Sequence, residues 1–213
     1  MTCKICGKET VLVYDKQFAI NYYRCENCEF LFMDDDALIS FDEERAVYDT
    51  HENSIENQGY VDMFKNFLDK CVLPFKQKGR LLDYGSGPEP VLIQVINRDY
   101  KFETDHYDLH YSPDKVYEGQ LYDVIVSTEV VEHIGDPLPV FKLIAKHLKP
   151  GGIFAFMTLY HLNNDEHFSD WWYRRDETHI SFFTLKTLEY ISKECDCEVI
   201  YSDHKRLTTF RKL

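Results

Sequence analysis

Short apolar runs recur along the 213-residue chain, and stretches with helical spacing separate most of them. The segments 80–83, 122–127 and 153–158 each contain apolar residues at adjacent positions, which is typical of strands buried on both faces of a parallel sheet. Further strands are predicted at 101–108, 198–201 and 207–210. This alternation of strands and helices predicts an α/β fold with a largely parallel sheet.

Helical periodicity fills the intervals between these runs. Apolar residues recur at close to every 3.6 positions in an amphipathic segment at 59–75. Three more helices are predicted at 91–96, 139–148 and 184–194, the last with Thr184 as its amino-terminal cap. Only about a dozen residues lie between the strands predicted at 101–108 and 122–127. A third strand, at 115–118, can therefore be no more than a truncated one.

A glycine-rich turn follows the strand at 80–83. Gly85 and Gly87 allow a tight turn and a close approach to a ligand, and Pro88 and Pro90 suit the first turn of the next helix. Ligands of open α/β sheets bind at this end of the strands. A dinucleotide fingerprint needs a third glycine where this chain has Pro90, so a nicotinamide or flavin site is disfavoured.

The sequence from Asp83 to Gly87 resembles the first motif of class I methyltransferases that depend on S-adenosyl-L-methionine (SAM), although Glu89 stands where the family often has another glycine. The segments 107–114 and 122–133 and the Lys-Pro-Gly-Gly turn at 149–152 resemble later family motifs, in the same order. The resemblance implies a Rossmann-like, seven-stranded methyltransferase sheet that binds SAM. It implies cofactor contacts from Asp83, Tyr84, Gly85, Ser86, Gly87, Asp108, Leu109, Ser127, Thr128 and Glu129.

The cofactor's ribose calls for an acidic residue about 20 positions beyond the glycine turn. Asp108 follows Gly87 by 21 positions and comes after an aromatic residue, as in the family's second motif. Asp105 is the competing candidate. A carboxylate at position 108 also suits a plain cap for the segment that begins at Ser112.

Four cysteines in two Cys-x-x-Cys pairs open the chain: Cys3, Cys6, Cys25 and Cys28. The pairs are eighteen residues apart, a spacing typical of a tetrahedral structural zinc site. Two short strands predicted between them, at 11–14 and 20–24, are too small to fold without the metal. Disulfides or a redox pair are the alternatives, but a cytoplasmic chain without a thioredoxin-like context disfavours both. The sequence therefore predicts a zinc ribbon over residues 1–32.

The net charge of −13 is concentrated in residues 33–58, which hold nine acids, Glu52 among them, and one arginine. This charge disfavours broad binding to nucleic acid. We interpret residues 33–78 as an acidic helical connector that serves as a lid, and residues 79–213 as the methyltransferase domain. In the bacterial small-molecule methyltransferases that this arrangement resembles, a tyrosine-bearing segment covers the cofactor. The matching residues here are Tyr48, Asp49 and Tyr60.

Two glutamates and two histidines are the candidates for chemistry on the acceptor: Glu129, Glu132, His133 and His179. The set resembles the metal-dependent small-RNA 2′-O-methyltransferases, in which such residues hold a divalent ion, and a similar Glu-His pair occurs in ubiquinone-pathway O-methyltransferases. Three interpretations stay open. These are a second divalent metal at the four residues, a general base at His133 or His179 with Glu132 beside it, and a structural role.

An aromatic insertion at 159–182 is expected to close over the acceptor, with Trp171, Trp172 and His179 facing Tyr48 of the connector. The expected function is SAM-dependent methylation of a small molecule at oxygen or carbon. An RNA methyltransferase and a non-catalytic SAM-binding module are the alternatives. The chain has no apolar run that would span a membrane and its start lacks the apolar core of a signal peptide, so a cytoplasmic protein is expected.

Overall fold

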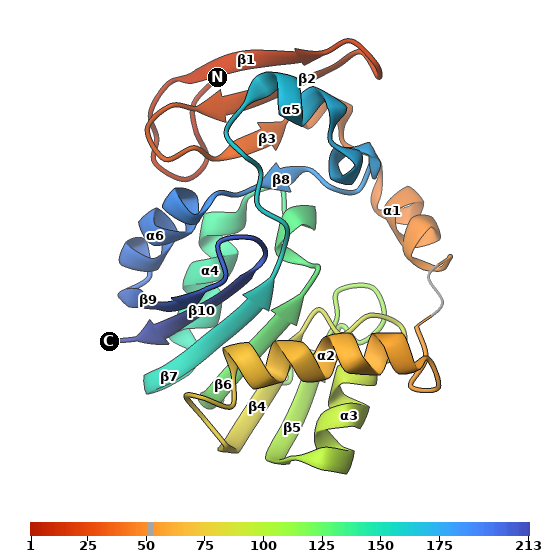
Figure 1. Ribbon diagram of the computed structural model, residues 1–213, viewed down its shortest axis with the longest axis vertical. Helices are drawn as coiled ribbons and strands as arrows, with labels where there is room; N and C mark the ends of the chain where they lie inside the picture. The colour runs from red at the N-terminus through yellow and green to blue at the C-terminus, as the bar shows by residue number, and fades with distance from the viewer. Residues whose placement is uncertain (51–52) are drawn as a thin grey trace.

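The computed structural model describes residues 1–50 and 53–213, so Glu52 of the connector lies outside the described residues. Six strands form one mixed sheet in the order β5-β4-β6-β7-β10-β9 (Figure 1). They are β4 (Lys78–Tyr84), β5 (Lys101–Tyr107), β6 (Tyr122–Thr128), β7 (Leu148–Met157), β9 (Cys197–Ser202) and β10 (Leu207–Lys212). The first four are parallel, and β10 is antiparallel to both β7 and β9. The α/β prediction is confirmed.

The sheet of the described residues has six strands where the sequence predicted seven. Residues 115–118 form a turn, in which the amide of Glu118 donates to the carbonyl of Lys115 (2.9 Å). The prediction of a truncated third strand was wrong. A crossover from one parallel strand to the next needs a dozen or more residues, which leaves no residues for a strand between β5 and β6. Tyr117 is instead buried, and its ring packs edge-on against Tyr107 with 5.1 Å between centroids.

Helices cover both faces of this sheet (Figure 1). One face carries α2 (Gln58–Cys71) and α3 (Val91–Asp99), and the other carries α4 (Pro137–Lys146) and α6 (Leu185–Glu194). Leu81 packs in the core beneath α2 and α3, whereas Leu82 packs in the core beneath α4 and α6. Successive residues of the central strands are therefore buried on opposite faces, which explains their unbroken apolar runs.

The amino-terminal segment builds a second, antiparallel sheet in the order β1-β2-β3-β8. Its strands are β1 (Thr10–Asp15), β2 (Ile20–Cys25), β3 (Leu31–Met33) and β8 (Ser181–Phe182). The first two are the predicted ribbon strands. The fourth comes from the far end of the insertion, after α5 (Asp165–Asp170) and the 3-10 helix η3 (Trp172–Arg175). A strand next to His179 therefore completes the sheet of the ribbon (Figure 1).

The connector begins with η1 (Asp35–Ala37) and α1 (Phe41–Tyr48). Ser40 caps α1 in a capping box with Glu43. The Phe41 ring stacks on His110 with 4.2 Å between centroids, which attaches α1 to the loop after β5. Among the helices of residues 1–50 and 53–213, none is both long and apolar enough to cross a membrane.

Candidate active site

A cavity of about 730 Å³ lies at the carboxyl ends of β4, β5 and β6. Nine of the ten residues predicted to contact SAM line it: Asp83, Tyr84, Gly85, Ser86, Gly87, Asp108, Leu109, Thr128 and Glu129. The tenth, Ser127, is buried beneath them, where its hydroxyl donates to the carbonyl of Tyr84 (2.8 Å). The predicted contacts therefore gather at the end of the sheet where ligands of this fold class bind.

Glycine is required at the first position of the turn. Gly85 has φ +90°, and a Cβ there would lie 2.4 Å from Cγ2 of Val130 in the loop after β6. Gly87 also has a left-handed backbone, with φ +69°. The amide of Gly85 donates to the carbonyl of Tyr107 at the end of β5 (2.8 Å). The turn is thus fixed to both neighbouring strands while its cavity side stays open to a ligand.

Asp108, and not Asp105, belongs to the cavity. One carboxylate oxygen of Asp108 accepts from the amide of Gly87 (2.8 Å), and the other accepts from the amides of His110 (2.9 Å) and Tyr111 (3.0 Å). Asp105 is engaged elsewhere, with Arg80 and the Tyr122 hydroxyl. Asp108, the acid that the family motif favoured, therefore lines the cavity, whereas its competitor Asp105 does not.

Asp83 is buried at the floor of the cavity, and its Oδ1 has no hydrogen-bond partner among the described residues. Burial raises the pKa of this carboxyl to about 7, and the nearby charge of Asp108 adds to the effect. At neutral pH the group is therefore divided between its two protonation states, unlike an exposed aspartate.

This shift predicts a pH-dependent stability. Between its ordinary pKa of 3.8 and about 7, native Asp83 keeps a proton that the unfolded chain has released, so the free energy of unfolding should fall as pH rises. At about 1.4 kcal/mol for each pKa unit, the fall amounts to a few kcal/mol. In Asp83→Asn this part of the dependence should vanish. Urea unfolding of both proteins at about pH 5 and 7.5 measures it, and equal pH dependence in the two would contradict the assignment.

The connector and the insertion both contribute residues to the lining of the same cavity. Tyr48 and Tyr60 line it from the connector, and Trp172 and His179 from the insertion. The Tyr48 hydroxyl donates to Oε1 of Glu44 (2.7 Å), and its ring meets the ring of His133 edge-on with 5.3 Å between centroids.

Two predicted contacts differ from this arrangement. Trp171 lines a neighbouring cavity of about 520 Å³ and not the main one. Asp49 lies behind the lining of the main cavity, where it accepts from the hydroxyl of Tyr111 (2.7 Å).

Glu132, His133 and His179 come together as predicted. Their ligand-type atoms all lie within 4.8 Å of one another. Nδ1 of His133 donates to the carbonyl of Thr178 (2.9 Å), and Nδ1 of His179 donates to the carbonyl of Tyr173 (2.7 Å). Because carbonyls only accept, each neutral ring carries its proton on Nδ1 and its lone pair on Nε2. Both rings therefore have the tautomer that a general base or a metal ligand needs.

Glu132 is fully buried, and its pKa is raised to about 8 by burial and by the charge of Glu129. Oε1 accepts from the hydroxyl of Tyr173, whereas Oε2 has no hydrogen-bond partner in the described part of the chain. An unpartnered buried carboxylate oxygen beside two imidazoles fits a cation or a polar ligand group at this point.

Glu129 lies outside this cluster, contrary to the predicted set of four. Its φ of +53° ends β6 before the 3-10 helix η2 (Val131–His133) begins, so it does not share a helical face with Glu132 and His133. Its Oε1 pairs with Arg206 (2.7 Å), and its Oε2 accepts from the Tyr173 hydroxyl (3.2 Å). Sequence reasoning missed both partners. Tyr173 was one aromatic among many in the insertion, and Arg206 lies in a turn far along the chain.

The four ribbon cysteines form a second compact cluster, with all sulfurs within 4.8 Å of one another. Cys3 and Cys28 lie 3.6 Å apart, and Cys6 and Cys25 lie 3.4 Å apart, measured between sulfurs. A tetrahedral zinc with Zn–S bonds of about 2.3 Å would separate its sulfurs by about 3.8 Å. The hydrogen bond between Cys3 and Cys28 lowers the pKa of the Cys3 thiol and raises that of Cys28, so Cys3 is the thiol of this pair that ionises first. The cluster fits a structural zinc.

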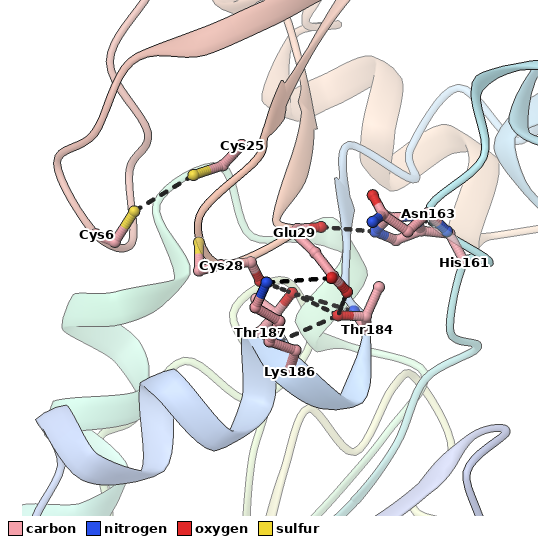
Figure 2. A network of polar contacts seen from close by, with 9 residues as sticks. All are labelled: Cys6, Cys25, Cys28, Glu29, His161, Asn163, Thr184, Lys186 and Thr187. Atoms are coloured by element: carbon pink, nitrogen blue, oxygen red, sulfur yellow. Dashed lines mark hydrogen bonds and ion pairs between the residues drawn. The ribbon is translucent and has the colours of Figure 1, made fainter.

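Hydrogen bonds join the second cysteine pair to the start of α6 (Figure 2). The Thr187 hydroxyl donates to the carbonyl of Cys28 (2.8 Å), and that of Thr184 donates to the Glu29 carboxylate (3.0 Å). His161 of the insertion donates through Nε2 to the carbonyl of Glu29 (2.8 Å). The ribbon is thus anchored to the main domain at the residues that follow its metal-ligand candidates.

Comparison with known proteins adds a family match. The model of a family described as a methyltransferase domain matches residues 57–202, which is more than half of the chain. A curated ubiquinone biosynthesis O-methyltransferase of Pectobacterium atrosepticum is 36% identical over 85 residues, covering 37% of this chain and 32% of that protein. The chain matches less than half the length of each such relative.

Solved structures share the fold at low identity. A chain from the complex between the Haloferax volcanii Trm112 methyltransferase activator and a methyltransferase is 15% identical, with a TM-score of 0.57 over 81% of this chain and 99% of that one. A methyltransferase in calicheamicin biosynthesis, solved in its S-adenosylhomocysteine-bound form, is 14% identical, with a TM-score of 0.53 over 81% of this chain and 59% of that one.

Proposed function

The chain belongs to the methyltransferase-domain family and is a SAM-dependent methyltransferase, and we propose that it methylates an oxygen or carbon of a small-molecule acceptor. One observation carries the proposal: the glycine turn with Asp108 and the two histidines with Tyr48 line the same cavity. The part that relatives play in ubiquinone biosynthesis supports a small acceptor. The acidic connector supports it too, because its charge repels phosphate-rich polymers.

In this proposal SAM lies across residues 83–87. The ribose hydroxyls donate to Asp108, and the methionine part lies near the backbone of residues 127–130. The open side of the glycine turn and the left-handed Glu129 next to β6 support this placement. The sulfonium methyl group then faces His133 and His179, which line the cavity, with Glu132 buried next to them.

Asp108→Ala is expected to weaken the binding of S-adenosylhomocysteine by about 1.5–3 kcal/mol, because it removes hydrogen bonds to a charged group. The dissociation constant should rise roughly 10- to 150-fold, as measured by calorimetry. Asp105→Ala is the matched control. It removes a carboxylate of β5 that is close to Asp108 in sequence but does not line the cavity. The affinity of this variant for S-adenosylhomocysteine should therefore stay within about twofold of that of the parent. Equal losses in both variants, or none in either, would contradict the role of Asp108.

The acceptor side supplies positioning and a proton acceptor. As the acceptor oxygen or carbon bonds to the methyl carbon, the carbon–sulfur bond of the sulfonium breaks and S-adenosylhomocysteine leaves. The proton of the acceptor passes to Nε2 of His133 or His179, since both rings hold Nδ1–H against carbonyls. The aromatic walls at Tyr48 and Trp172 support a planar or sugar-like acceptor.

A more specific version of this proposal adds a divalent metal near the acceptor, in addition to the zinc of the ribbon. Glu132, His133 and His179 would hold it, and the unpartnered Oε2 of Glu132 supports this ligand set. A metal bound there would act as a Lewis acid and lower the pKa of an acceptor hydroxyl. Glu129 is not part of the set, because Arg206 and Tyr173 hold its carboxylate.

The ribbon completes the proposal. Cys3, Cys6, Cys25 and Cys28 bind one structural zinc within the ribbon at 1–32, the connector at 33–78 serves as a lid, and residues 79–213 carry out the chemistry. Four thiolate ligands leave no open position on zinc, so this metal takes no part in the reaction. Reduced thiolates suit a cytoplasmic location.

A methyl-transfer assay with radiolabelled SAM tests the function. The panel contains catechol-type rings, sugars bearing free hydroxyls, and ribosomal and transfer RNA. We expect labelled small-molecule products and release of S-adenosylhomocysteine. Labelling of RNA alone would replace the proposal with an RNA methyltransferase. Tight SAM binding with no turnover on any acceptor would replace it with a binding module.

A further inference from the structure

We propose that the ribbon positions the acceptor-side groups through the buried ion pair of Asp15 and Arg174, which holds Tyr173 against Glu132. The inference rests on the proposed function, because it concerns the groups assigned there to the acceptor. Asp15 ends β1 of the ribbon, whereas Arg174 lies in η3 of the insertion. The two residues are 159 positions apart in sequence.

The guanidinium of Arg174 is held by groups of the ribbon and the insertion. Its side chain is fully buried, and Nη1 donates to Oδ2 of Asp15. Nη2 donates to Oε1 of Gln17 (3.0 Å), and Nε donates to the carbonyls of Phe168 and Ser169 (both 2.9 Å). All three nitrogens of the guanidinium are thus engaged by the ribbon and the insertion, and Arg174 does not line the main cavity. It cannot act on a substrate directly.

Tyr173, the next residue, contacts three members of the site. Its hydroxyl donates to carboxylate oxygens of Glu132 and Glu129, and its carbonyl accepts from Nδ1 of His179 (2.7 Å). Its ring lies 4.1 Å from that of His179, measured between centroids. Fixing Arg174 fixes the backbone at Tyr173, and with it the position of a carboxylate and an imidazole.

A second connection reaches the same groups from the other side. β3 pairs with β8, and the amide of Met33 donates to the carbonyl of Ile180 (2.9 Å). The amide of Ile180 in turn donates to the carbonyl of Glu132 (2.9 Å). The ribbon therefore holds both ends of the segment from Tyr173 to Ile180, which contains His179.

The chemistry explains why a charged pair would occupy this place. Apolar residues can replace a buried ion pair with little loss of stability, so stability alone does not account for it. Its directional bonds fix orientation, and a displacement of about 1 Å in catalytic groups can lower a rate about 100-fold. Asp15 and Arg174 are positioning residues in this sense.

The test replaces both charges at once, in the double variant Asp15→Leu with Arg174→Met, so that no unpaired buried charge remains. Turnover should fall about 10- to 100-fold, while the affinity for S-adenosylhomocysteine stays within about twofold. Asp165→Asn is the matched control. It breaks the exposed pair of Arg24 and Asp165, which also joins the ribbon to the insertion, and turnover should be unchanged.

Two further measurements separate positioning from general damage. In a Tyr173→Phe background the double variant should lower turnover by a smaller factor than it does in the parent, because both changes disturb the hydrogen bond from the Tyr173 hydroxyl to Glu132. In proton NMR of the S-adenosylhomocysteine complex, the buried hydroxyl proton of Tyr173 is identified by its absence in Tyr173→Phe. Its resonance should be shifted or lost in the double variant and retained in Asp165→Asn.

An unshifted resonance in a folded double variant, or unchanged turnover, would overturn the inference. The NMR arm needs no acceptor. A shifted resonance in a protein that methylates nothing would therefore refute the proposed function and leave the positioning role supported.

Discussion

Cys25→Ser is expected to lower methyl transfer by about 100-fold or more, while S-adenosylhomocysteine binding changes little. Structural zinc contributes on the order of 10 kcal/mol to folding in small zinc modules, so a three-thiolate ribbon should lose its metal and its order. The strands β1 and β3 then release Arg174 and β8, and with them Tyr173 and His179. The cofactor turn at 83–87 is built on the main sheet, which shares no strand with the sheet of the ribbon.

Metal analysis, turnover and calorimetry on the same preparations measure this result. The parent protein, purified without added metal, should contain one zinc per chain. Cys195→Ala, which removes a buried thiol outside the ribbon, is the control and should keep both zinc and activity. Less than about half an equivalent of zinc in the parent, together with four titratable thiols in the ribbon, would contradict the assignment of zinc to this site.

His179→Ala is expected to lower turnover by about 100- to 10,000-fold, the range of a lost general base. The affinity for S-adenosylhomocysteine should remain within about twofold, because we propose that His179 contacts the acceptor and not the cofactor. His167→Ala is the matched control, since that histidine is exposed on the same insertion. Comparable losses in the two variants would mean that the insertion, and not the imidazole of His179, is what the reaction needs.

Glu132→Gln then separates the two chemical forms of the site. Burial raises the pKa of Glu132 to about 8, so without a metal the group is mostly protonated near pH 7 and glutamine is a close mimic. With a metal the carboxylate is a required ligand. A metal-free base therefore predicts a turnover within about tenfold of the parent, whereas a metal site predicts a loss of 100-fold or more together with weaker Mn²⁺ binding.

Local patterns predicted most of the main sheet and its helices, because strand burial and helical period are written in neighbouring residues. The cavity floor was also predictable, since motif spacing brings residues 83–87 and Asp108 to one edge of a parallel sheet. The prediction of a third strand was wrong because the chain between β5 and β6 is too short to hold one. The distinction between Asp108 and Asp105 came from the family motif, and side-chain partners now supply its physical reason.

The remaining features depend on contacts between distant residues. No local sequence pattern around Ser181 predicts a strand. The strand forms by pairing with Phe32, which lies about 150 positions earlier. The pairing of Arg174 with Asp15 was hidden for the same reason. Glu129 was assigned to the wrong cluster because a left-handed backbone at a non-glycine residue leaves no mark in sequence.

The β3–β8 pairing also imposes an order on synthesis. All four ribbon cysteines precede the strands of the main sheet in the sequence, so zinc can bind while that sheet is still untranslated. The sheet of the ribbon stays one strand short until residues 181–182 appear. The apolar edge of β3 therefore stays unpaired until β8 has been synthesised. Premature release before residue 181 would leave that edge available for aggregation.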